Sequence, residues 1–579
     1  MTVSPNGTNQ RAYSAPLSIL VESRCMVDSL NAPQLSRGAD LRRRAFRMFR
    51  PSHQHSAFSA TLLLMSAVML SRIVGYLREL YIAWLFGAGA QTDAYVAGFT
   101  IPDWLNYILA GGTASITFVS IYTRFLADGK EEEAQKTFSV TITVMTAVLG
   151  LGIILTEIFA PQISRWWFAG FTQQQLDLCV HLTRILLPAQ LFFYVGGVVS
   201  AVLLSRRLFL FPAFGPLIYN AFIILGGMLL SRPLGIASLA WGALLGSIIG
   251  PFLVNAIGAA KVGMRFRVSF DIHNKAFREW IRLSIPLMLG VSLVTADDWI
   301  LRHFASGGVG EITRLNYAKR LFALPIAVLG QAVSQASLPF FARLFSEKRM
   351  QEFGNTVNES IFRIVAVSLL VSSFMMAASL PLVDLAYRRG HFHFSDSQET
   401  ALYFFWFSLS LAFWAAQGLY ARAFYAAGNT ITPMVASTLI TLVSLPIYAA
   451  LYHAFSTVGL ALASDLGILA NCSAMAILLH RRKLVATVNL RWGELSKAAL
   501  TAAVAGVLSY FVARGVMTSN SRASDGKALA LITVTWSASV AAGLWITRSQ
   551  LPAELRRRTK ANAPPDTEEA GKLTAGIEP

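Results

Sequence analysis

SRIVGYLRELYIAWLFGAGAQTDAYVAGFTIPDWLNY, residues 71–107, is the stretch that decides the fold of this chain. It begins inside an apolar run and then carries Arg72, Arg78, Glu79, Asp93 and Asp103. An ionisable group at bilayer depth costs roughly 2.5–3.5 kcal/mol on insertion scales, so such groups usually face a wet cavity or a partner. The concentration of charge in this stretch therefore predicts the place where a polar ligand is held.

The composition of the whole chain excludes an ordinary soluble protein. Of its 579 residues, 54% are hydrophobic and only 14% are charged. Charge-free runs such as Ile185–Leu204 and Leu208–Leu230 are long enough to cross a bilayer as helices. Only helices and closed barrels span lipid, and these runs do not alternate as strands do, so we expect an all-α polytopic membrane protein.

The apolar runs predict fourteen transmembrane helices. They lie near residues 57–83, 92–123, 138–160, 180–204, 208–230, 234–260, 281–303, 315–345, 360–386, 399–425, 430–452, 456–480, 495–514 and 527–547. Residues 1–56 are read as a disordered basic cytoplasmic tail, and residues 551–579 as a disordered cytoplasmic tail. Alternate loops are rich in Lys and Arg, which predicts that both termini lie in the cytoplasm.

The net charge of +18 fits this topology better than it fits a nucleic-acid binder. The basic residues lie in short loops between apolar runs, as the positive-inside rule describes, so we expect no nucleic-acid partner.

A weak internal repeat divides the chain into two lobes. Residues 121–138 resemble residues 340–357, and residues 235–246 resemble residues 459–470. Two six-helix lobes follow, residues 57–260 and 281–480, with residues 495–547 outside the repeat as two further helices. Repeated halves with the ligand between them are typical of transporters.

Five segments carry a resemblance to a known family. SRIVGYLRE, FGAGAQTDAY, IPDWL, PAFGP (212–216) and RLFALPIAVLGQAVSQASLP (320–339) resemble the MurJ/MviN lipid II flippases of the multidrug/oligosaccharidyl-lipid/polysaccharide exporter superfamily. The resemblance runs over about residues 60–545. It implies a fourteen-helix bundle that moves an undecaprenyl-diphosphate-linked peptidoglycan precursor from the inner to the outer leaflet by alternating access, for cell-wall synthesis.

The resemblance also implies a set of substrate-binding residues. The family's cavity positions fall on Ser71, Arg72, Arg78, Asp93 and Arg320. Where family members commonly carry an arginine pair, this chain has Asn106 and Tyr107, and we include Asn106 in the expected site. Family members often have an acidic residue at Ala323 and an asparagine at Asp103. These departures favour, as an alternative substrate, another polyprenyl-diphosphate saccharide of the O-antigen or exopolysaccharide type.

The chemistry of arginine supports a diphosphate ligand independently. A guanidinium binds phosphate bidentately and keeps its proton, so Arg72, Arg78 and Arg320 are the expected headgroup anchors. On an ideal helix Arg72 and Glu79 share a face, whereas Arg78 lies about 120° round. Both arginines then reach one cavity only if the helix bends, and Gly75 is the expected bend. The competing interpretation is structural, with Arg78 paired to Glu79 or Asp93.

The remaining polar features are weaker signals. Asp298 and Asp465 are candidates for a coupling Na⁺ or H⁺, Asp298 and Arg302 for a helix ion pair, and membrane potential for the driving force. His391 and His393 lack a visible third ligand, so we expect no metal and no cofactor.

Three other functions were compared with the flippase. A related exporter differs only in substrate. A membrane enzyme would need an acidic or base-bearing loop of appreciable size, which is not visible, so we expect no enzyme activity. A non-transporting scaffold would act through cell-wall synthesis proteins, which are also possible partners of a flippase; the other expected partners are membrane lipids.

Overall fold

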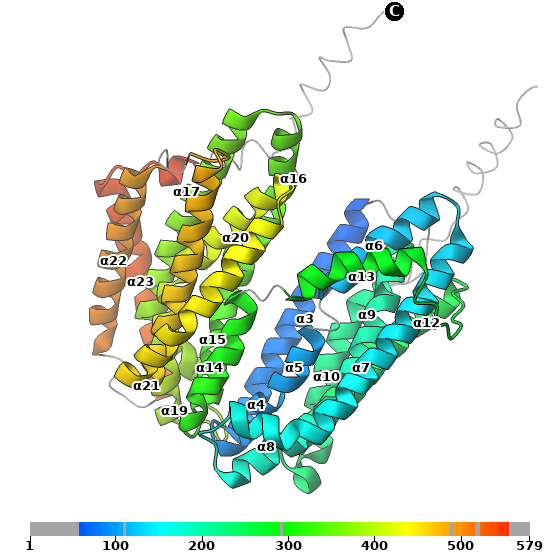
Figure 1. Cartoon of the computed structure of the whole chain (residues 1–579). Coiled ribbons are helices and arrows are strands. Elements are labelled where there is room, and N and C mark those ends of the chain that lie inside the picture. Colours follow the sequence, from blue (N-terminus) through cyan, green and yellow to red (C-terminus); the bar gives the residue numbers. More distant parts are fainter. Residues whose placement is uncertain (1–56, 108–111, 290–292, 487–489, 516–520, 555–579) are drawn as a thin grey trace, which may run out of the picture. The chain divides into compact units, whose positions relative to one another are not determined.

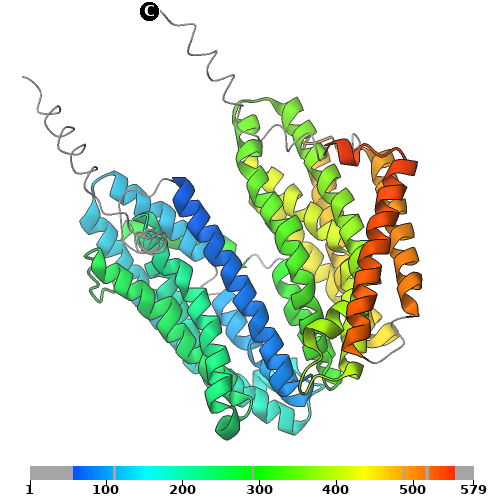
Figure 2. The same ribbon diagram turned by 180° about the vertical axis from the view of Figure 1, so that it is seen from behind.

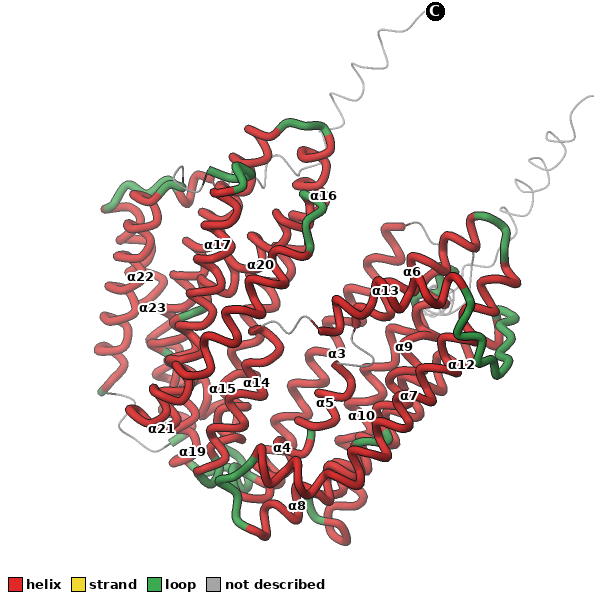
Figure 3. Tube along the Cα trace, in the orientation of Figure 1, coloured by secondary structure: helices red, strands yellow, loops and turns green. Residues whose placement is uncertain are grey.

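The structure, a computed structural model, describes residues 57–107, 112–289, 293–486, 490–515 and 521–554. The predicted tail 1–56 and residues 555–579 lie outside the described residues. Residues 60–579 form one compact unit, and the description below concerns that unit. All regular elements in the described ranges are helices (Figures 1 and 3), as the apolar runs predict.

The first lobe contains the helices from α3 to α12. Their bounds are α3 (Ala57–Phe86), α4 (Ala90–Gly98), α5 (Thr100–Leu105), α6 (Gly112–Ala127), α7 (Glu131–Trp167), α8 (Gln173–Leu186), α9 (Ala189–Ser205), α10 (Leu210–Leu234), α11 (Ala237–Ser247), η2 (Ile248–Val254) and α12 (Asn255–Lys261). Close approach of α10 and α11 depends on glycine, because a Cβ at Gly226 or Gly242 would meet the backbone of the other helix.

The second lobe contains the helices from α14 to α21. Their bounds are α14 (Leu293–Phe304), η3 (Ala305–Gly307), α15 (Glu311–Pro325), η4 (Ile326–Ala332), α16 (Val333–Ser346), α17 (Met350–Ala377), α18 (Ser379–Tyr387), α19 (Phe394–Leu409), α20 (Leu411–Ala426) and α21 (Ile431–Arg481). The amphipathic helix α13 (Lys275–Leu289) precedes this lobe and packs on α6 and α7. The predicted span 281–303 thus corresponds to the end of α13 and to α14.

Two C-terminal helices, α22 (Trp492–Arg514) and α23 (Arg522–Ile546), pack against each other and against α17 and α18 (Figure 2). A short helical segment follows at residues 551–554. In it Leu551 is buried, and Glu554 pairs with Arg363 and Arg491. The predicted disordered tail therefore does not begin at residue 551.

Left-handed backbone positions confirm the internal repeat. Helix ends with positive φ recur about 220 residues apart, in the pairs Gly129/Lys348, Arg207/Gly428, Gly235/Ser456 and Gly263/Lys483. Gly235 and Ser456 have nearly the same conformation, with φ/ψ of 54°/−136° and 55°/−142°. The sequence alignment of residues 235–246 with 459–470 is therefore wrong by three residues, because small apolar residues recur closely in both segments.

Nine helices in the described residues are long and apolar enough to cross a membrane, or ten if the bent pair α19 and α20 is one span. The bend between those two helices is 44°. Where the structure describes them, the fourteen predicted spans are mainly helical, but the number of crossings stays a prediction. Spans 11 and 12 both lie within α21, which changes direction at Ser456.

Four turns of the two lobes meet at one end of the unit. Backbone atoms of the α7–α8 turn at Gly170 lie against Gly307 in the turn before α15. The N–H of His391, in the α18–α19 loop, donates to the carbonyl oxygen of Trp84 at the end of α3, at 3.1 Å. The sequence predicts all four turns on the same, outer side. We call this contact region the closed end.

Candidate functional site

Guanidinium groups from the two lobes share one buried carboxylate. Glu79 of α3 is only 5% exposed. It forms an ion pair with its neighbour Arg78, and its Oε1 lies 3.7 Å from Nε of Arg320 in α15. Arg78 also donates to Oδ1 of Asn220 in α10 at 2.9 Å, and that amide is oriented by its own bond to the Pro216 carbonyl. Arg78 is thus fixed on two sides, whereas half-exposed Arg320 has only a long contact.

Arg72 lies on the same seam, two helical turns before Glu79. It is exposed and donates from Nη2 to Oε1 of Gln331 in η4, at 2.6 Å. All three predicted arginines therefore lie where α3 faces α15 and η4. The helix α3 is uninterrupted across Gly75, and the bend expected at that residue stays a prediction. Glu79 lies on the same face of α3 as Arg72 and forms an ion pair with Arg78.

The remaining predicted residues of α3 and α5 have different surroundings. Ser71 is half-buried beside Arg72. Asn106 donates to Oε1 of Gln190 in α9, at 2.7 Å, and so pairs within its own lobe. The adjacent Tyr107 packs edge-on against Trp299 of the second lobe, with ring centroids 5.6 Å apart.

Asp93 caps a helix of the opposite lobe. It is fully buried in α4, and it accepts bonds from N–H of Gly310 (2.5 Å), N–H of Thr313 (2.9 Å) and the Thr313 hydroxyl (2.6 Å). These groups form the N-terminus of α15, where unpaired N–H groups and the helix dipole favour a carboxylate. The oxygens of Asp93 therefore link the two lobes at the closed end, and its contact with substrate stays a prediction.

A second ion pair between the lobes was missed by the sequence analysis. Nη1 of Arg302, in α14, donates to Oδ2 of Asp103 at 3.3 Å and to the Thr100 hydroxyl at 3.1 Å. The expected helix pair between Asp298 and Arg302 is not formed, because Asp298 pairs with Lys319. The positive charge of Arg302 thus compensates the carboxylate of Asp103, which the sequence analysis noted as a departure from the family pattern.

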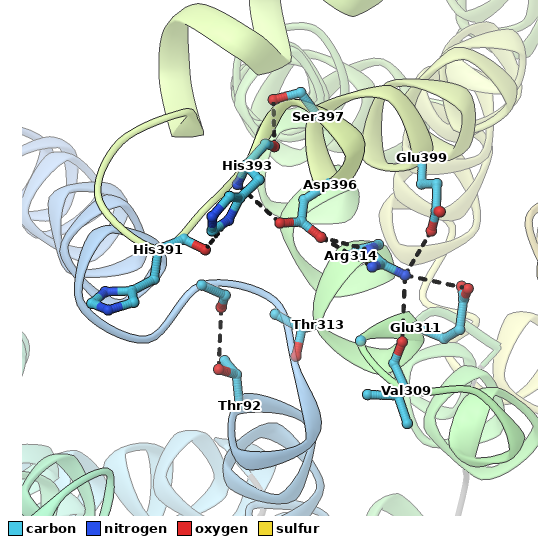
Figure 4. Close-up of polar contacts among 12 residues, drawn as sticks. Thr92, Val309, Glu311, Thr313, Arg314, His391, His393, Asp396, Ser397 and Glu399 are labelled. Atoms are coloured by element: carbon cyan, nitrogen blue, oxygen red, sulfur yellow. Dashed lines mark hydrogen bonds and ion pairs between the residues drawn. The ribbon is translucent and has the colours of Figure 1, made fainter.

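Figure 4 shows the polar contacts beside the closed end. Arg314 lies within ion-pair distance of Asp396 (3.0 Å), Glu399 (2.6 Å) and Glu311 (3.5 Å). The N–H of His393 donates to Asp396, which caps α19, and the His393 ring contacts the carbonyl of His391. Within the described residues no three His, Cys, Asp or Glu side chains gather as a metal site.

The candidate coupling site contains a side-chain cation. Lys319 Nζ lies 2.5 Å from Oδ2 of the buried Asp297 and also contacts Asp298. Ser464 donates to Asp297 at 2.9 Å, and Tyr448 donates to it as well. Asp298, predicted as a cation ligand, therefore shares the ammonium group of Lys319 with Asp297. Asp465 is buried, and its oxygens have no hydrogen-bond partner among the described residues, so its role in coupling stays a prediction.

Two repeated helical lobes with an ion-pair network between them define a polytopic membrane transporter. The chain belongs to the family of the lipid II flippase MurJ, because the family model matches residues 82–521. The membership agrees with the resemblance of the five sequence segments described above.

Named relatives are similar over most of their length. The probable lipid II flippase MurJ of Buchnera aphidicola is 27% identical over 427 residues, which is 72% of this chain and 82% of that protein. The corresponding protein of Rhizobium tropici is 26% identical over 424 residues, covering 72% of this chain and 79% of the relative. The lipid II flippase MurJ of Burkholderia cenocepacia is 27% identical over 351 residues, covering 58% and 66%.

Solved structures confirm the fold. A lipid II flippase MurJ in an inward closed conformation superposes with a TM-score of 0.70 at 21% identity, covering 83% of this chain and 99% of that one. An inward-facing multidrug-resistance transporter of the MATE family gives a TM-score of 0.59 at 16% identity, covering 74% of this chain and 99% of that one.

Proposed function

We propose that this protein moves an undecaprenyl-diphosphate-linked peptidoglycan precursor across the bacterial inner membrane by alternating access. Family membership and the shared Glu79 support this proposal. The moving group is a headgroup with a diphosphate, and no bond of the substrate is made or broken. Both chain termini then lie in the cytoplasm, and the closed end faces outward.

The charge of the network matches a diphosphate. Arg72, Arg78 and Arg320 with Glu79 sum to a net charge of +2, and a diphosphate diester carries about two negative charges and many acceptor oxygens. Arg78 is held by two partners, but the Arg320 Nε–Glu79 distance of 3.7 Å exceeds a hydrogen bond. Arg320 can therefore turn to a phosphate without breaking a strong contact, and the ligand then connects both lobes.

Alternating access follows from the seam between the lobes. The Asp93 cap and the Trp84–His391 bond hold the closed end shut, while Arg72 and Arg78 lie earlier in α3. Substrate enters from the end opposite the closed end. Opening the closed end breaks these bonds. The contacts of a bound diphosphate with arginines of both lobes offset the free energy lost, so the empty protein stays closed at this end.

Membrane potential is the proposed driving force. A net-positive empty network is attracted to the negative inside, at roughly 2.3 kcal/mol per charge for each 100 mV across the full membrane. In the second lobe Lys319 pairs with both Asp297 and Asp298, which leaves that cluster with one negative charge. The arginine network carries the larger charge, +2, so we place the voltage-sensitive charge there.

The proposal is tested in proteoliposomes with fluorescent lipid II, by measuring its accessibility from each leaflet. Arg320→Ala loses one charge-assisted contact, worth about 1.5–3 kcal/mol, and we expect transport at sub-saturating substrate to fall roughly 10- to 150-fold. Arg343→Ala, an exposed arginine with an ordinary i,i+4 ion pair, is the matched control. Equal transport by both variants would disprove the assignment of Arg320.

The same assay distinguishes lipid II from the alternative substrate, another polyprenyl-diphosphate saccharide. Asp103, Asn106 and Tyr107 depart from the family pattern, and the first two are already paired with Arg302 and Gln190. A competing polyprenyl-diphosphate O-antigen saccharide should slow lipid II transport only weakly. Stronger transport of that competitor would transfer the proposal to it.

A further inference from the structure

The segment between α12 and α13 exposes large apolar side chains without being a helix. Residues 264–272 alternate in sequence between apolar and polar types, and four of the apolar side chains are at least half exposed: Phe266 (52%), Val268 (70%), Phe270 (64%) and Ile272 (52%). Burying such a side chain is worth about 1.5–3 kcal/mol each, so a run of four is unfavourable in water. We call this run the apolar strap.

The apolar strap lies along a helix predicted to span the membrane. The N–H of Arg267 donates to the Ser139 hydroxyl, and the N–H of Ser269 donates to the Thr143 hydroxyl, both at 3.2 Å. Ser139 and Thr143 lie roughly 12–18 Å from the start of α7, at 1.5 Å per residue. The exposed apolar face of α7 begins soon after, at Val148. The strap therefore lies beside the edge of the apolar part of α7.

The internal repeat allows a comparison with those residues of the second lobe that the structure describes. In the second lobe Asn358 of α17 donates to the Ala486 carbonyl at 2.9 Å, about 220 residues from the Ser139 contact. The segment around Ala486 corresponds to the strap, but Val485 and Leu490 are buried and α22 follows directly. Two described apolar side chains are thus buried in the second lobe, whereas four apolar side chains of the strap are exposed in the first.

The charges around the strap are basic. Its neighbouring acids are engaged: Asp271 pairs with Lys136 at 2.9 Å, and Glu279 pairs with both nitrogens of Arg124. The exposed Arg265, Arg267, Lys275 and Arg282 are left to determine the local potential. Exposed aromatic and aliphatic groups together with basic residues are typical of segments that lie in the interface of an anionic membrane.

We propose that residues 264–272 insert into the membrane interface and bind anionic phospholipid headgroups through Arg265 and Arg267. The four apolar side chains enter the acyl boundary, and the two guanidinium groups lie at the phosphate level. Because the strap is bonded to α7, its insertion holds the first lobe at a fixed depth in one leaflet. In the proposed topology this is the inner leaflet. A protein partner on the strap is an alternative that the experiment excludes or reveals.

The depth of the strap is measured on the full chain in lipid nanodiscs. Nitroxide labels at Val268→Cys and Phe270→Cys report their accessibility to oxygen and to a water-soluble nickel complex. We expect both labels to be accessible to oxygen and shielded from nickel. A label at Lys130→Cys, in the exposed α6–α7 turn, is the matched control and should be open to nickel. Labels at 268 and 270 as open to nickel as the control would overturn the proposal.

The preference for anionic lipid is measured by native mass spectrometry during titration with phosphatidylglycerol. Each basic residue near a charged surface contributes about a factor of five in affinity, so Arg265→Gln/Arg267→Gln should weaken the tightest phosphatidylglycerol binding roughly 30-fold. Arg481→Gln/Arg482→Gln, exposed at the end of α21 just before the corresponding place of the second lobe, is the control and should change it little. Equal losses in both variants, or equal binding of phosphatidylcholine, would contradict the proposal.

Discussion

Replacement of Asp93 by Asn should open the closed end. Oδ1 of Asp93 accepts two bonds from Thr313, and Oδ2 accepts the bond from Gly310. Asparagine keeps one acceptor oxygen but places an NH₂ group against the second donor. The lost charge-assisted bond and the unsatisfied N–H together cost about 2–3 kcal/mol. The ratio of closed to open molecules should therefore fall roughly 30- to 150-fold.

The distance between the lobes at the closed end is the quantity to measure. Nitroxide labels at Gln174 and Ser395, both exposed, can be followed by pulsed electron resonance in nanodiscs. Asp93→Asn should add a population at longer distance that the parent protein lacks. Thr313→Val removes only the hydroxyl bond and should shift the ratio about fivefold, for a cost of about 1 kcal/mol. An unchanged distance distribution in Asp93→Asn would refute the assignment of this carboxylate as a cap between the lobes.

Two further predictions concern packing and buried charge. Gly390→Ala places a Cβ against the Trp84 backbone at a φ of +58°, so we expect a longer distance at the closed end in the same measurement. Gly428→Ala has similar backbone strain (φ +71°) in open space and should leave that distance unchanged. Lys319→Met leaves Asp297 buried without its cation, which should cost about 3–5 kcal/mol and lower the midpoint temperature of unfolding in detergent. Adding Asp297→Asn should restore most of that loss, and a double variant as unstable as the single one would contradict this account.

The helical fold could be predicted because its signal is local. Each apolar run of about 20 residues indicates a spanning helix without knowledge of its neighbours. The alignment of residues 235–246 with the second lobe could not be predicted correctly. Gly235 and Ser456 correspond through their backbone conformation, whereas the sequences around them are equally compatible with a shift of three residues.

The candidate site was predictable in residue type but not in partnership. The arginines are visible as charges in apolar runs. Two of the partners are neutral and distant in the chain: Asn220 lies 142 residues from Arg78, and Gln331 lies 259 residues from Arg72. The partner of Asp93 was also not predictable. A buried carboxylate gives the same sequence signal whether it faces a ligand or the N-terminus of a helix 217 residues further on.

The sequence analysis named Glu79 as a structural partner of Arg78, and that pair is present in the structure. Glu79 follows Arg78 directly and lies on the same helix face as Arg72, seven residues away. Its second partner is Arg320 of the other lobe and not Arg72, and this long-range contact could not be predicted from the sequence.

The most direct test of the arginine network is the affinity of the purified protein for undecaprenyl diphosphate, measured for the parent, Arg78→Ala, Arg320→Ala and the double variant. Both groups should contact the same diphosphate, so each single variant should bind at least tenfold more weakly, and the two losses should not add in the double variant. Parent-like affinity in both single variants would show that the diphosphate does not bind between Arg78 and Arg320.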